Sequence, residues 1–122
     1  MRFLLALLLC PSLAWAQDVS VGQGVACDSQ AQMESFMAKW DGKNGLEVLK
    51  VVNVEAQKDN ACIASMWMFS ERKVVNPRLV TRTGAWKVLE VNIWGAILGP
   101  MSVQFPSPLI QYIALKLKEE EA

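Results

Sequence analysis

The sequence predicts an α+β domain, with two N-terminal helices packed on an antiparallel sheet of about four strands and one disulfide. Three observations support this fold class. Two segments in the first half have helical hydrophobic spacing, the second half alternates apolar and polar residues in strand-length runs, and two cysteines follow an N-terminal export signal. A block of helices before a block of strands is typical of folds in which the helices cover one sheet face.

The first sixteen residues are expected to be a signal peptide. Arg2 supplies the positive charge, residues 3–9 form the apolar run, and Ala14-Trp15-Ala16 matches the small-x-small cleavage pattern. We therefore expect residues 1–16 to be removed. Residues 17–122 then form a single α+β domain in the periplasm or outside the cell.

A retained membrane anchor and a lipidated Cys10 are the alternatives for this segment. Both are weaker interpretations. The apolar run is far shorter than the roughly 20 residues that span a bilayer, and Leu9 stands where lipoprotein processing requires a small side chain. Because no other run is long and apolar enough, we expect no transmembrane segment after cleavage.

Cys27 and Cys62 are the two cysteines left after cleavage. In an oxidising compartment two lone cysteines most simply form a disulfide, and two cysteines allow one pairing. The alternative is a redox-active or metal-binding pair, which would normally show a Cys-x-x-Cys spacing or a nearby histidine. The sequence has neither, so we expect a structural disulfide, no metal and no cofactor.

The helical segments follow a polar, glycine-containing lead at residues 20–24. Apolar residues then recur at i, i+3, i+4 and i+7 on one helical face: Met33, Phe36, Met37 and Trp40. Ser29 with Gln32 matches a capping box that starts this helix. A second helix is predicted from Leu46 to Gln57, because Asn44 and Glu47 form a start signal and the run lacks strict alternation, although its valines also favour a strand.

The rest of the chain is strand-like. We predict strands at Cys62–Ser70, Val74–Thr83, Trp86–Trp94 and Leu109–Lys118. The polar residues 71–73 are expected to form a turn, Asn76-Pro77 marks an edge position or a bulge, and Thr83-Gly84 forms a second turn. Residues 95–108 are expected to form a loop or an irregular hairpin that contains Gly99-Pro100.

Composition excludes several classes of function. The formal net charge is zero, whereas a nucleic-acid-binding protein normally has a basic excess. The absence of histidine removes the commonest general base and the Ser-His-Asp arrangement. We therefore predict no catalytic residue. Glu90 is the carboxylate to examine. Burial among tryptophans would raise its pKa and mark a site, whereas on a face open to water, the interpretation that we favour, Glu90 is simply solvated.

The tryptophans suggest a binding surface. Trp86 and Trp94 share a predicted strand face with Glu90 and Asn92, a mixture that is typical of contact surfaces. We expect this face, with the apolar segment Ile93–Met101, to bind an unknown envelope protein or a second copy, unless the rings complete the core. The alternatives are an anion-binding module that uses Arg72, Arg78 and Arg82, and an enzyme centred on Glu90.

Three short stretches carry a resemblance to a known group of proteins: Gly22-Gln23-Gly24 to Cys27-Asp28-Ser29-Gln30, Val52-Asn53-Val54-Glu55, and Ala61-Cys62. With these stretches the chain resembles short secreted proteins of rhizobia and related alphaproteobacteria, a group with no assigned activity. The resemblance implies a periplasmic location, paired cysteines and no catalytic residue to carry over. The basic segment at Arg72-Lys73 and the tryptophan-rich strand depart from that group.

Overall fold

The computed structural model describes residues 19–118, and the predicted signal peptide lies outside them. The elements are, in chain order, β1 (Ser20–Cys27), α2 (Gln30–Lys39), α3 (Gly45–Glu55), β2 (Cys62–Thr81), β3 (Gly84–Leu98) and β4 (Met101–Lys116). The four strands form an antiparallel barrel in the order β1-β2-β3-β4, which closes where β1 meets β4. The predicted α+β class is confirmed, but a strand precedes the two helices.

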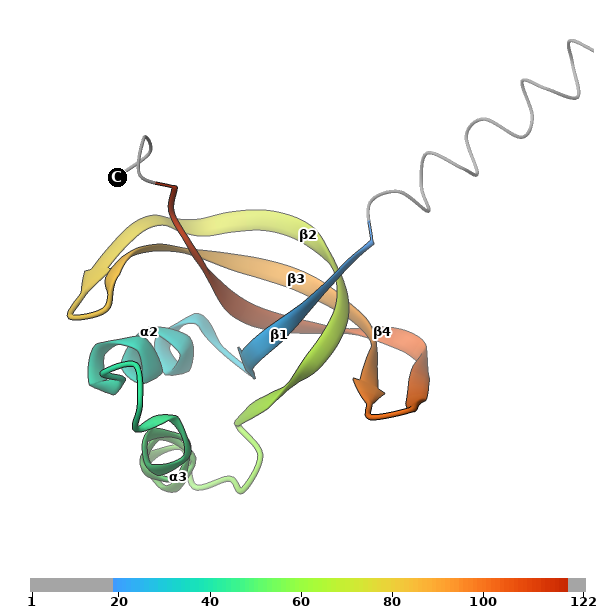
Figure 1. The fold of residues 1–122 in the computed structure, drawn as a ribbon, viewed down its shortest axis with the longest axis horizontal. Coiled ribbons are helices and arrows are strands. Elements are labelled where there is room, and N and C mark those ends of the chain that lie inside the picture. The colour runs from blue at the N-terminus through green and yellow to red at the C-terminus, as the bar shows by residue number, and fades with distance from the viewer. Residues whose placement is uncertain (1–18, 119–122) are drawn as a thin grey trace, which may run out of the picture.

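Figure 1 shows how these elements are arranged. The helix pair lies on one side of the barrel, next to the β2–β3 hairpin, and the β3–β4 hairpin projects on the other side. None of the helices within residues 19–118 is long and apolar enough to cross a membrane.

β1 occupies the segment that we predicted to be a polar lead, so that prediction is wrong. The strand pairs with β2 along its whole length, from Ser20 opposite Phe69 to Cys27 opposite Cys62. Its two glycines, Gly22 and Gly24, argue against a strand in the sequence, because glycine is depleted in strands. A Cβ atom at Gly22 would lie 3.3 Å from the Phe69 ring, so the small residue leaves room for a large aromatic side chain.

Both predicted helices are confirmed. Ser29 caps α2, and its Oγ accepts a hydrogen bond from the backbone N–H of Gln32 at 3.2 Å. The other half of the capping box does not form, because Gln32 Oε1 is buried without a hydrogen-bond partner. Asn53 on α3 accepts from the backbone N–H of Cys62 and donates to its carbonyl, which fastens α3 to the start of β2.

β2 corrects the predicted strand pattern. It runs without a turn from Cys62 to Thr81, where we predicted two strands separated by a turn at residues 71–73. Shifts in register between Glu71 and Lys73 and on both sides of Asn76 bend the strand instead of ending it. The predicted bulge at Asn76-Pro77 is therefore confirmed, but β2 is not an edge strand, because it pairs with both β1 and β3.

β3 and β4 extend beyond their predicted limits. The predicted turn at Thr83-Gly84 is confirmed, and β3 continues past Trp94 to Leu98. Residues 95–108, for which we predicted a loop or an irregular hairpin, form an irregular hairpin: residues 95–98 pair with residues 101–104 around Gly99-Pro100, and residues 105–108 have no register partner on β3. Leu98 opposes Met101 at its tip.

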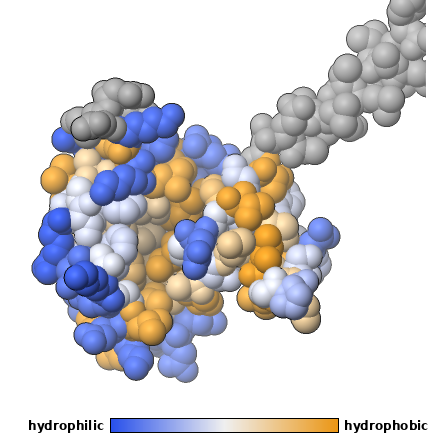
Figure 2. All heavy atoms as spheres, viewed as in Figure 1, coloured by the Kyte–Doolittle hydropathy of each residue, from blue (hydrophilic) through white to orange (hydrophobic). Residues whose placement is uncertain are grey.

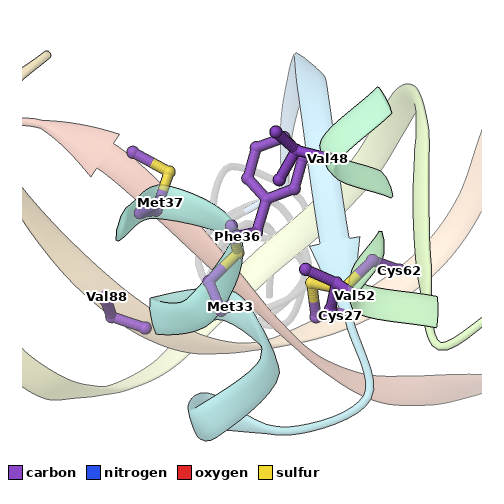
Figure 3. Close-up of a cluster of buried hydrophobic side chains, with 8 residues drawn as sticks. All are labelled: Cys27, Met33, Phe36, Met37, Val48, Val52, Cys62 and Val88. Carbon is purple, nitrogen blue, oxygen red and sulfur yellow. A yellow bond between two sulfur atoms is a disulfide. The ribbon is translucent and has the colours of Figure 1, made fainter. Parts of the chain in front are cut away.

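Two hydrophobic clusters hold the domain together. The first lies between the helices and the outer face of the barrel, and Figure 3 shows its side chains, with the disulfide beside Val52 at one side of the cluster: Cys27, Met33, Phe36, Met37, Val48, Val52, Cys62 and Val88. The second, inside the barrel, consists of Ala26, Leu89, Val91, Ile93 and Ile113, with Trp67, Phe69 and Phe105 packed against them. The predicted disulfide is confirmed, with an S–S distance of 2.01 Å, and it links the end of β1 to the start of β2.

Candidate functional site

Trp86 packs beneath α2. Its ring centroid lies 5.8 Å from that of Trp40, and its indole N–H donates to Thr83 Oγ1 at 3.1 Å. The ammonium group of Lys116 lies 5.2 Å from the ring centroid, a cation–π arrangement. Trp86 is therefore half-buried against the first cluster.

Trp94 lies in a different environment on the same strand. It stands at the register shift between Ile93 and Gly95, where it is an extra residue relative to β2 and faces the four unpaired residues 105–108 of β4. Its side chain is 39% exposed, and its indole N–H donates to Ser70 Oγ at 2.9 Å. Asn92, partly buried, opposes Ser70 on β2. We expected Trp86 and Trp94 to share a binding face. Trp86 is instead packed against Trp40 at the end of α2, and only Trp94 is exposed.

Glu90 is held by two donors. The Tyr112 hydroxyl donates to Oε2 at 2.8 Å, and Arg72 Nε donates to Oε1 at 3.0 Å. These hydrogen bonds hold the pKa of the Glu90 carboxyl below its ordinary value, and they raise the pKa of the Tyr112 hydroxyl. The side chain is only 13% exposed, yet the pKa of Glu90 is not raised as burial alone would raise it, because the two hydrogen bonds outweigh the effect of burial.

This carboxylate makes stability depend on pH. Because the pKa of Glu90 is lower in the folded chain, its contribution is present above the ordinary value of 4.5 and is lost as the pH falls below it. Glu90→Gln lacks that contribution, so its unfolding free energy is expected to fall less steeply below pH 4.5. Urea unfolding between about pH 3 and 7 measures both slopes. Parallel profiles for the two proteins would contradict the proposed role of Glu90.

The three arginines of the predicted anion site are not grouped. Arg72 is paired with Glu90, and the backbone N–H of Arg78 donates to Asn76 Oδ1. Arg82 lies at the β2–β3 turn. The pKa of Asp41 is lowered mainly by two backbone hydrogen bonds to its carboxylate, and the positive charge of Arg82 lowers it further. Arg72 lies within β2, whereas Arg82 lies in the turn after the end of that strand, ten positions further along the chain.

A charge-free surface is the feature that sequence reasoning recognised only in part. From Val91 to Leu115 the sequence contains no charged residue, and this stretch forms the β3–β4 hairpin. We call residues 94–110 the uncharged arm. Its exposed apolar side chains are Trp94 (39%), Leu98 (54%), Met101 (61%), Val103 (38%), Leu109 (51%) and Ile110 (49%). Figure 2 shows mostly orange and pale residues along this projection. The length of the charge-free run is the signal that predicts it from sequence.

No group of three or more potential metal ligands comes together within residues 19–118. Comparison of the chain with protein-family models, with curated proteins and with solved structures gives no match.

Proposed function

We propose that this protein is a non-enzymatic interaction module of the cell envelope that binds a protein partner through the uncharged arm. The observation that carries the proposal is the exposure of six large apolar side chains on a segment with no charge. Exposed apolar side chains that gather in one region mark interaction surfaces more often than scattered ones do. An arm without charges also suits a second copy, because a symmetric contact places like against like without repulsion.

The arm is suited to contact through side chains rather than through strand addition. Within the described residues, β4 pairs with β1 only at Tyr112, so its outer edge is free along Met101–Ile110. Pro106 and Pro108 lie on this stretch and lack the N–H that an added strand would need. The backbone edge is thus protected, while the apolar side chains remain available.

The disulfide supports an exported location, since such bonds persist in oxidising compartments. A surface role also agrees with the hydrogen bonds of Glu90. Its carboxylate is engaged on both oxygens and its pKa is lowered, an arrangement that favours a structural role over a general acid.

The test replaces two exposed apolar residues of the arm by aspartate. Leu98→Asp/Met101→Asp is expected to abolish association while lowering the unfolding free energy by no more than about 1 kcal/mol, because both side chains are exposed and the only new cost is two like charges opposite each other. Sedimentation velocity of the purified protein measures self-association, and retention of envelope proteins on the immobilised protein measures other partners.

Val51→Asp/Val54→Asp is the matched control. These residues are also exposed and apolar, but they lie on α3 among Lys50 and Glu55. The control is expected to associate as the original protein does. Equal association by all three proteins contradicts the proposal, and so does binding of the arm to lipid vesicles with no protein partner, which would make the arm a membrane contact.

A further inference from the structure

A pocket lies between the helix pair and the barrel, away from the uncharged arm. Its volume is about 500 Å³, within the range of about 300–1,000 Å³ typical of small-molecule sites. α2 supplies Met33, Phe36 and Met37, which Figure 3 shows extending from that helix, and Trp40 follows at its C-terminal end. The rest of the apolar lining comes from α3 and the four strands: Val25, Leu46, Leu49, Ala64, Trp86 and Ala114.

The pocket lies over the stretch of the barrel where β1 and β4 do not pair with each other. Cys27 opposite Tyr112 is the one register pair between β1 and β4 in the described chain, so these two strands do not pair with each other at Gly24, Val25 and Ala114. A Cβ atom at Gly24 would meet nothing within 4 Å. The disulfide and α3 hold the helix pair at the far end of β1, and the space over the unpaired stretch remains unfilled.

The lining is polar at only a few places and has one charge. Lys43, in the loop between the helices, is the charged residue among those that line the pocket, and the lining contains no carboxylate. The nearest carboxylate in sequence, Asp41, accepts hydrogen bonds from the backbone N–H groups of Lys43 and Asn44. The Asp41 carboxylate therefore interacts with the backbone of the loop between the helices.

We propose that this pocket binds a small apolar molecule that carries one anionic group, of the class of medium-chain carboxylates. The apolar part would lie along the methionines and the two tryptophans, and the anionic group would meet the Lys43 ammonium at the mouth. Methionine side chains adapt to irregular apolar ligands, which suits a flexible chain. The inference does not depend on the arm, since no arm residue lines the pocket.

Decanoate is the probe for the test. The indole N–H signals of the folded protein report its position by NMR, because Trp40 and Trp86 line the pocket while Trp67 and Trp94 do not. Saturable shifts of the Trp40 and Trp86 signals alone are expected. No saturable shift at millimolar decanoate, or shifts centred on Trp94, would overturn the proposal.

Two pairs of variants test the lining. Ala64→Phe places a ring in the pocket and is expected to weaken decanoate binding at least tenfold, whereas Ala38→Phe, at an exposed alanine outside the lining, is expected to leave it unchanged. Lys43→Gln is expected to weaken it about threefold, as removal of an exposed charge pair does, and Lys50→Gln is the control. The Lys43→Gln variant should bind decanol as the original protein does. Unchanged binding of decanoate to Ala64→Phe contradicts the proposed site. If that variant fails to fold, the indole N–H shifts of the original protein still test the proposal.

Discussion

Replacing both Cys27 and Cys62 by alanine is expected to lower the free energy of unfolding by about 4 kcal/mol. The bond closes a loop of sequence separation 35 that contains both helices, so its loss frees a large part of the unfolded chain. Small domains are stable by about 5–15 kcal/mol, and this loss is a large share of that total. Urea unfolding of the oxidised protein and the variant measures the difference.

The reduced original protein is the control for this prediction. It keeps both buried cysteine side chains and lacks only the covalent bond, so it separates the effect of the cross-link from that of lost packing. Reduced protein and double variant should agree within about 1 kcal/mol. A loss below about 1 kcal/mol in both would show that the helix pair is held by packing alone.

Gly95→Ala is expected to lower the unfolding free energy by about 2 kcal/mol, because it overpacks the base of the arm. A Cβ atom at Gly95 would collide with the carbonyl oxygen of Val103 and with the Met68 side chain. The carbonyl belongs to the backbone of β4, so the two strands of the arm must separate to accept it. Gly95→Ala should therefore also weaken association through the arm, which sedimentation velocity detects.

Gly24→Ala is the matched control, since its Cβ atom would meet nothing within 4 Å. Its unfolding free energy should stay within about 0.5 kcal/mol of the original. Equal losses for the two glycines would indicate a general effect of alanine in these strands and would contradict the close contact at the base of the arm.

The helices were predictable because their signals are local. The spacing of Met33, Phe36 and Met37 matches the face that is buried, and Ser29 caps α2 as its sequence pattern indicates. The disulfide followed from cysteine number and the predicted compartment, and it joins register partners of β1 and β2.

The strands were less predictable because their limits depend on the barrel. Gly22, Gly24 and Ala26 alternate as small residues, a period-two pattern whose meaning appears only in the folded chain, where Trp67 lies opposite Gly22 and the Phe69 ring packs against that glycine. The polar residues 71–73 resemble a turn, but Arg72 lies within a continuous strand and pairs with a carboxylate on β3. Local composition does not report such cross-strand partners.

The surfaces were the least predictable part of the molecule. Trp86 and Trp94 have the same strand parity, yet α2 covers one and not the other, because the helices reach only one end of β3. The residues that line the pocket come from six separate elements and the loop between the helices, so no single sequence motif predicts the pocket. Lys43 is proposed to bind an anionic group only because it lines the pocket, and the surrounding sequence does not indicate this role.

A photo-crosslinking amino acid at position 98, in protein produced in the cell envelope, tests the central claim most directly. Val54 is the comparison site, since it is apolar and 76% exposed but lies on α3. The proposed role of the arm predicts a discrete protein adduct from position 98, its loss when Met101→Asp is added, and no adduct from position 54. Equal adducts from both positions, or none from position 98, would contradict it.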